Sequence, residues 1–170
     1  MLERSQSDSA LVLFSERLTN SAAFGALFRE GMDLVEETAA YLDGDGRIEA
    51  KALDRPVSLT YATESMRLTT RLMQLASWLL LHRAVKEGEM TLTQANREKT
   101  KVKLSAADPG PTELIEKLPQ QLQDLISRSM DLQTRVRRLD TTIHAPAPDR
   151  TSIGNPLVPQ LNRLKAAFEQ

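Results

Sequence analysis

The sequence contains few residues that could carry out chemistry, and their spacing favours structural roles. It has two histidines, His82 and His144, and no cysteine, which excludes disulfides, thiol catalysis and cysteine-bound metals. No metal ligand stands three or four residues after His82, where Val85 and Lys86 lie. His144 directly precedes a proline-rich stretch. We therefore expect both histidines to pack in the protein or to lie on its surface, without a bound metal or cofactor.

One acidic pattern resembles a calcium-binding loop. The stretch YLDGDGRIEAKA (41–52) places Asp43 and Asp45 beside glycines, as an EF-hand loop does. That loop needs an acidic ligand at its first position and a bidentate carboxylate at its twelfth. Tyr41 and Ala52 occupy those two positions here. The pattern therefore favours a glycine-rich helix end over a calcium site.

Other catalytic patterns are absent from the sequence. It has no nucleophile elbow, no phosphate-binding glycine loop and no zinc-protease motif. Glu64 stands three residues before Arg67, a spacing that favours an ion pair on a helix surface. We therefore predict that the protein is not an enzyme and has no catalytic, cofactor-binding or metal-binding residues.

The composition indicates a helical protein. A chain of 170 residues is long enough for one domain with its own core. Hydrophobic residues make up 41% of it but aromatic residues only 4%, so leucine, methionine, alanine and valine must fill the interior. Such interiors are typical of helix-on-helix packing, whereas β-sandwiches and barrels use more aromatic and β-branched residues.

The charge balance predicts no general attraction to nucleic acid or to an anionic membrane, because the net charge is −1. The basic residues between 97 and 103 and between 135 and 138 lack aromatic neighbours for base stacking. The amino-terminal residues do not resemble a signal peptide, and the apolar run 72–81 has about half the length of a membrane span. We therefore expect a cytoplasmic protein with no direct nucleic-acid or membrane partner.

Periodic apolar residues predict three long helices. Their expected spans are about 21–43, 57–87 and 112–143, the last with an alternative start at Pro119. Asn20 or Ser21 can cap the first helix, and Gly44 can end it. Gly31 lies on the apolar face of that helix, where it permits the close approach of a neighbour. The second helix is expected to start after Pro56, which disfavours helix in the preceding residue.

These elements predict an all-α protein built as a three-helix bundle with a flexible carboxyl-terminal tail. The predicted division is an amino-terminal arm (1–20), the bundle (21–143) and the tail (144–170), which carries a short amphipathic segment. The connections at 44–56 and 89–111 are expected to be loops, the second with one short helical turn.

The second helix is apolar on almost every side, most clearly in RLMQLASWLLLH (71–82). We predict that two adjacent seams contact two neighbouring helices; one comprises Tyr61, Leu68, Leu72, Leu75 and Leu79, and the other Met66, Thr69, Met73, Ala76 and Leu80. A third stripe comprises Trp78, Leu81 and Val85. Either residues 89–111 or the ALVLF segment (10–14) cover this stripe, or it is a surface for self-association or for a protein partner.

The end of the chain offers a second candidate protein-binding surface. Leu161, Leu164 and Phe168 recur at helical spacing after the proline-rich segment. They predict a short apolar helix face that docks on a partner.

Three stretches resemble a known bacterial family. FREGMDLVEETAAYLDGDGR (28–47), RPVSLTYATESMRLTTRLMQLASWLLLHRAV (55–85) and RRLD (137–140) are similar to the regulator of CtrA degradation (RcdA) family. The resemblance implies a three-helix bundle that dimerises and has a flexible tail. It also implies a non-enzymatic adaptor for the ClpXP protease that works with a response-regulator adaptor (CpdR) and tethers cargo such as cell-cycle transcription regulators.

Two other functions agree with the same lack of catalytic groups. The chain could be a small-molecule or nucleotide sensor with a pocket between its helices, or a purely structural dimerisation module.

Overall fold

The computed structural model describes residues 21–99 and 112–144. Within these ranges the protein is all α, as predicted, and no strand occurs. The helices are α2 (Ala22–Asp43), α3 (Asp45–Lys51), α4 (Arg55–Lys86), α5 (Leu92–Lys99), α6 (Thr112–Ile115) and α7 (Gln120–His144). The predicted arm and the predicted tail after His144 lie outside the described residues.

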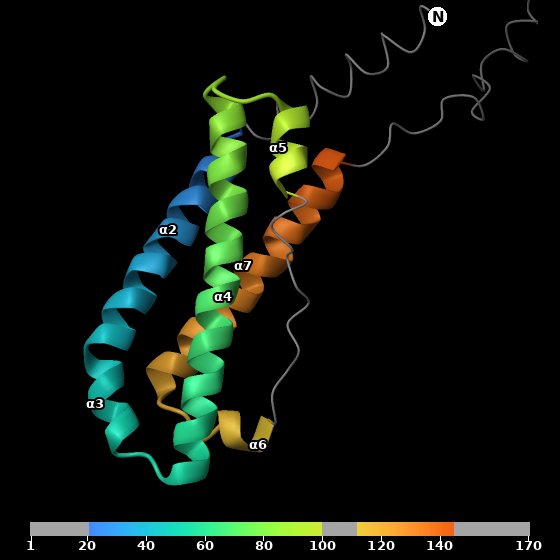
Figure 1. Ribbon diagram of the computed structural model, residues 1–170. Coiled ribbons are helices and arrows are strands. Elements are labelled where there is room, and N and C mark those ends of the chain that lie inside the picture. The colour runs from blue at the N-terminus through green and yellow to red at the C-terminus, as the bar shows by residue number, and fades with distance from the viewer. Residues whose placement is uncertain (1–20, 100–111, 145–170) are drawn as a thin grey trace, which may run out of the picture.

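The three long helices α2, α4 and α7 each pack against the other two (Figure 1). The short helices α3, α5 and α6 all pack against α4, which makes α4 the centre of the fold. Leucine dominates the core between the long helices, together with Phe24, Tyr41, Trp78 and Val136. On the surface, Arg128 donates to Glu37 at 2.9 Å and joins α7 to α2.

Local signals account for most helix ends. The Ser21 hydroxyl accepts a hydrogen bond from the Phe24 amide at 3.2 Å, so it caps α2 as predicted. The predicted start of the second helix after Pro56 is wrong by two residues. Helix α4 begins at Arg55, with Pro56 in its first turn, where the missing amide proton costs nothing. Gly88 follows α4 with a φ of 75°, a left-handed conformation that glycine adopts readily.

The connections contain more helix than predicted. The expected loop at 44–56 is wrong over Asp45–Lys51, which forms α3. The negative charge of Asp45 in the first turn and the positive charge of Lys51 in the last turn both interact favourably with the helix dipole of α3. Gly46 is buried beside Tyr61 and so packs α3 against α4. The single helical turn expected after Thr93 is the longer helix α5, which packs against α4.

The close approach predicted at Gly31 is confirmed. A Cβ atom at this position would overlap Cδ1 of Leu79 on α4 and would lie 3.6 Å from Cδ2 of Leu132 on α7. Gly31 therefore lets α2 contact both other long helices at one point.

We expect Gly31→Val to lower the free energy of unfolding by about 1–3 kcal/mol, because the added side chain must displace Leu79. Gly25→Ala is the matched control in the same helix, since a Cβ there meets no atom within 4 Å. It should raise stability by up to about 1 kcal/mol through helix propensity alone. Urea unfolding followed by circular dichroism measures both changes, and equal stability of Gly31→Val and the parent would contradict the close approach.

Candidate docking surface and buried polar cluster

One predicted seam of α4 is buried. Leu68, Leu72, Leu75 and Leu79 all lie in the core, as expected from their spacing. Tyr61, the first member of that seam, is half-buried. This face of α4 is the one that holds the bundle together.

The prediction that a second seam contacts another helix is wrong. Met66, Met73 and Leu80 are 71%, 67% and 53% exposed, Thr69 is exposed and Ala76 is half-buried. The second buried face of α4 is instead formed by Glu64, Arg71, Trp78 and His82. These side chains are mostly polar, so apolar periodicity did not reveal them.

The polar residues of this second face find partners. Arg71 donates from Nη1 to Oγ of Ser129 on α7 at 2.7 Å. The predicted pair of Glu64 and Arg67 forms at 2.7 Å, although the Glu64 side chain is buried rather than on the surface. Hydrogen bonds of this kind offset the cost of removing polar groups from water.

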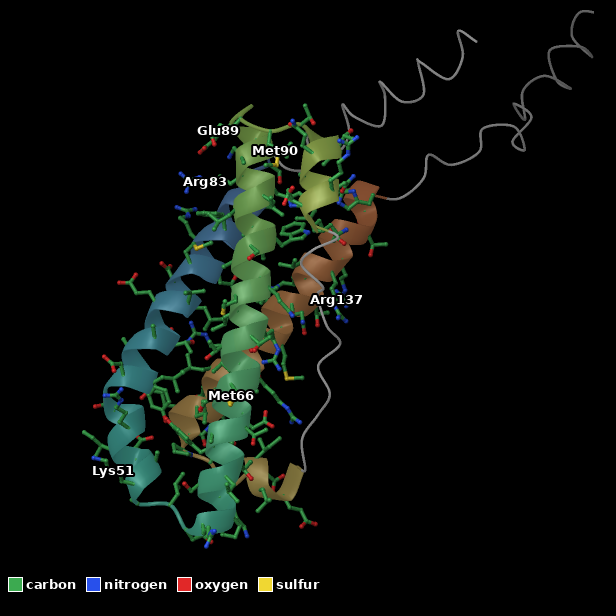
Figure 2. All side chains as sticks on the ribbon, in the orientation of Figure 1. Lys51, Met66, Arg83, Glu89, Met90 and Arg137 are labelled. Carbon is green, nitrogen blue, oxygen red and sulfur yellow. The ribbon has the colours of Figure 1, made fainter. Side chains whose placement is uncertain are left out.

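An exposed apolar stripe runs along the outer side of α4. We call it the α4 stripe; it comprises Leu59, Met66, Met73 and Leu80. The members recur every seven residues, so they follow one line along the helix for about 30 Å. Figure 2 shows Met66 on the side of α4 that is turned toward the viewer. The exposed surface of α4 between Pro56 and Leu80 is mostly uncharged, and the partly exposed Arg67 within it is paired with Glu64.

Three hydroxyl groups beside the α4 stripe are already bonded within the helix. Thr63, Thr69 and Ser77 donate to the carbonyl groups four residues earlier, at 3.0, 2.8 and 2.8 Å. A partner that covers this face would therefore leave none of these donors unpaired, which lowers the cost of removing water. The stripe has the properties of a protein-docking surface.

The stripe of Trp78, Leu81 and Val85 was interpreted either as covered by other residues or as an exposed surface for association. Trp78 contradicts the second interpretation, because it is buried. It is 1% exposed, whereas Leu81 and Val85 are half-buried. Its indole stacks on the ring of His82, with centroids 4.0 Å apart, and its Nε1 donates to Oδ1 of Asp140 at 2.8 Å. The alternative, that residues from 89–111 pack over this side of α4, agrees with the position of α5.

A cluster of polar side chains lies where α4, α5 and α7 meet, and we call it the buried polar cluster after its fully buried member His82. Its other members, Asp140, His144 and Lys99, are half-buried. Lys99 of α5 donates to Oδ2 of Asp140 at 2.6 Å, and Nε2 of His144 lies 3.3 Å from Oδ1. Nδ1 of His82 lies 2.9 Å from the carbonyl oxygen of Trp78. The ligand atoms of His82, Asp140 and His144 all lie within 4.8 Å of one another.

Contacts and burial within the cluster shift the pKa values of Asp140 and His82. Burial alone would raise the pKa of Asp140, but its contacts with His144, Lys99 and Trp78 outweigh burial and hold that pKa well below its usual range. Burial lowers the pKa of His82, against the opposing effect of the Trp78 carbonyl. At neutral pH Asp140 is therefore a carboxylate and His82 a neutral imidazole.

This cluster was not predicted, because no metal ligand follows His82 at helical spacing. His144 was expected to begin the tail, whereas it is the last residue of α7. The available signal was the four-residue spacing of Asp140 and His144, which puts both on one helix face.

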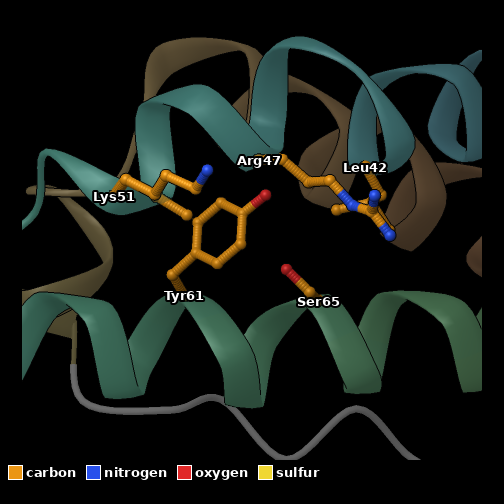
Figure 3. A pocket seen from close by; sticks show the side chains of 6 residues that line it. Leu42, Arg47, Lys51, Tyr61 and Ser65 are labelled. Atoms are coloured by element: carbon orange, nitrogen blue, oxygen red, sulfur yellow. The ribbon is translucent and has the colours of Figure 1, made fainter.

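A separate pocket lies between α3 and α4 (Figure 3). Leu42, Arg47, Ala50, Lys51, Tyr61 and Ser65 line it. Arg47 pairs with Asp43 at 3.3 Å, and both side chains are largely exposed. The segment that resembles a calcium loop therefore contributes one cation–carboxylate pair beside this pocket.

Leu161, Leu164 and Phe168 lie outside the described residues, and their docking role stays a prediction. Among the helices that the structure does describe, none is both long and apolar enough to cross a membrane.

Comparisons with known proteins agree with the fold. The family described as "Protein of unknown function (DUF1465)" matches residues 15–168. The crystal structure of RcdA from Caulobacter crescentus CB15 is 49% identical, with a TM-score of 0.64, and the match covers 77% of this chain and 98% of that chain. No curated protein matches the chain significantly.

Proposed function

Because the chain belongs to the regulator of CtrA degradation (RcdA) family, we propose that it is a non-enzymatic adaptor for regulated proteolysis. It tethers cargo proteins, such as cell-cycle transcription regulators, to the ClpXP protease in the cytoplasm and works with a CpdR-like response-regulator adaptor. The observation that carries this proposal is the 49% identity to RcdA over nearly the whole of that protein.

The α4 stripe supports a role in protein association. We assign it to self-association of two copies, because a seven-residue apolar spacing keeps one seam in contact along two packed helices. Few charges flank the stripe, and the two arginines beside it are paired, Arg67 with Glu64 and Arg83 with Glu87, which limits repulsion between identical surfaces. A dimer of adaptors would carry two cargo-binding tails, which raises the effective concentration of cargo at the protease.

A reconstitution experiment tests the adaptor function. The protein should bind ClpX and CpdR in a pull-down and should accelerate cargo degradation by ClpXP. The pocket of Figure 3, which contains Arg47, Lys51 and Tyr61, supports the alternative of a small-molecule sensor. Thermal stabilisation by a nucleotide or metabolite, without binding to ClpX or CpdR, would favour that alternative.

We expect deletion of residues 145–170 to change the melting temperature by less than about 2 °C and to weaken delivery of cargo. The core that the structure describes is built from residues 24–143, and Leu161, Leu164 and Phe168 form the predicted docking face. Leu161→Ser combined with Leu164→Ser should reproduce the loss in the full-length chain. Thermal melting and reconstituted ClpXP degradation measure the two effects.

A large drop in melting temperature would mean that the tail completes the core. Full delivery of every cargo by the deleted chain would show that the tail has no docking role.

A further inference from the structure

We propose that His82, Asp140 and His144 form a binding site for one divalent transition-metal ion of the zinc class. The site lies inside the buried polar cluster and joins the carboxyl-terminal half of α4 to the last turn of α7. It is independent of the adaptor function proposed above.

His82 is arranged as a metal ligand. The Trp78 carbonyl can only accept a hydrogen bond, so the 2.9 Å contact places the imidazole proton on Nδ1. Nε2 then carries a lone pair, and this atom is buried without a hydrogen-bond partner in a side chain that is 0% exposed. A backbone carbonyl that fixes the tautomer in this way is the usual second partner of a metal-bound histidine.

Asp140 and His144 supply the other two ligands. They are four residues apart on α7, and their ligand atoms lie within 4.8 Å of each other and of a ring nitrogen of His82. Nε2 of His144 lies 3.3 Å from Asp140 Oδ1 but makes no well-formed hydrogen bond, so it too is available. Two imidazoles and one carboxylate suit zinc, cobalt and nickel, and three protein ligands leave one position open.

Lys99 sets a limit on the affinity of this site. Its ammonium group lies 2.6 Å from Asp140 Oδ2 and would repel a divalent ion bound at the neighbouring oxygen. The site should therefore exchange its metal more readily than a structural zinc site does. Removal of the Lys99 charge should tighten metal binding.

A bound metal would act on the end of the bundle. His144 is the last residue of α7, and residues 145–170 continue directly from it. A metal that joins His144 to His82 would fix where this segment leaves the bundle.

The test uses the full chain, treated with chelator and titrated with Co²⁺ and Zn²⁺. We expect one ion per chain, visible Co²⁺ absorption, and a melting temperature that rises with Zn²⁺. Histidine NMR signals give a direct readout, because the chain has only these two histidines and no cysteine. Both imidazoles should shift on addition of Zn²⁺.

His144→Gln and Asp140→Asn should each weaken Zn²⁺ binding at least tenfold, and Lys99→Met should strengthen it severalfold. Asp131→Asn is the matched control, since it removes an exposed carboxylate from the same helix and should change nothing. Circular dichroism of the metal-free variants checks that each is folded. No NMR shift in the parent, or equal binding by His144→Gln and the parent, would overturn the proposal.

Discussion

Leu75→Asp will abolish cooperative folding, whereas Met73→Asp will leave the protein folded. Leu75 is 1% exposed in the core between the long helices, and Met73, two residues earlier on α4, is 67% exposed. Burying a carboxylate without a partner costs several kcal/mol, which is comparable with the whole stability of a small domain. An aspartate at position 73 lies on the outer face of the single chain, where water solvates its carboxylate.

Circular dichroism during heating measures both variants against the parent. Leu75→Asp should give no cooperative transition, or a melting temperature lowered by more than about 15 °C. Met73→Asp should still melt cooperatively, at a temperature lowered at most by the contribution of self-association. Similar melting of the two variants would contradict the assignment of inner and outer faces to α4.

Met66→Glu combined with Met73→Glu will weaken self-association by more than about 100-fold. Across a two-fold interface the two substitutions place four carboxylates along one seam, and like charges in contact cost several kcal/mol. Ile48→Glu is the control, because Ile48 is 71% exposed on α3 and lies outside the α4 stripe. Sedimentation equilibrium measures the dimer constant of each variant.

The same double variant should deliver cargo to ClpXP less well, if two tails on one dimer hold cargo more strongly than one. A dimer that persists in Met66→Glu/Met73→Glu would exclude the α4 stripe as the self-association surface. A parent protein that is monomeric at all concentrations would exclude self-association itself.

The sequence by itself determined the fold class and the long helices, because the signals for these are local. Ser21 caps α2 through the amide of Phe24, three residues away, and Pro56 indicates the start of α4 to within two residues. The leucines from Leu68 to Leu79 mark one buried face through their spacing alone. The family resemblance in 28–47 and 55–85 also lies in continuous stretches of sequence, and the comparisons confirm it.

Only the tertiary structure decided which of the remaining faces of α4 is buried. Composition favours Met66 and Met73 for the interior over Arg71 and His82, yet the methionines are exposed and the polar residues are buried. A polar side chain is stable in the interior when a remote element supplies its partner. Ser129 supplies one for Arg71, 58 residues away.

The polar cluster depends on the same kind of distant pairing. Asp140 accepts from Trp78 and Lys99, which are 62 and 41 residues away in the sequence. The spacing of Asp140 and His144 shows that they share a helix face, but it contains no information about what that face contacts. Packing of α7 against α4 brings His82 to them, and with it the candidate metal site.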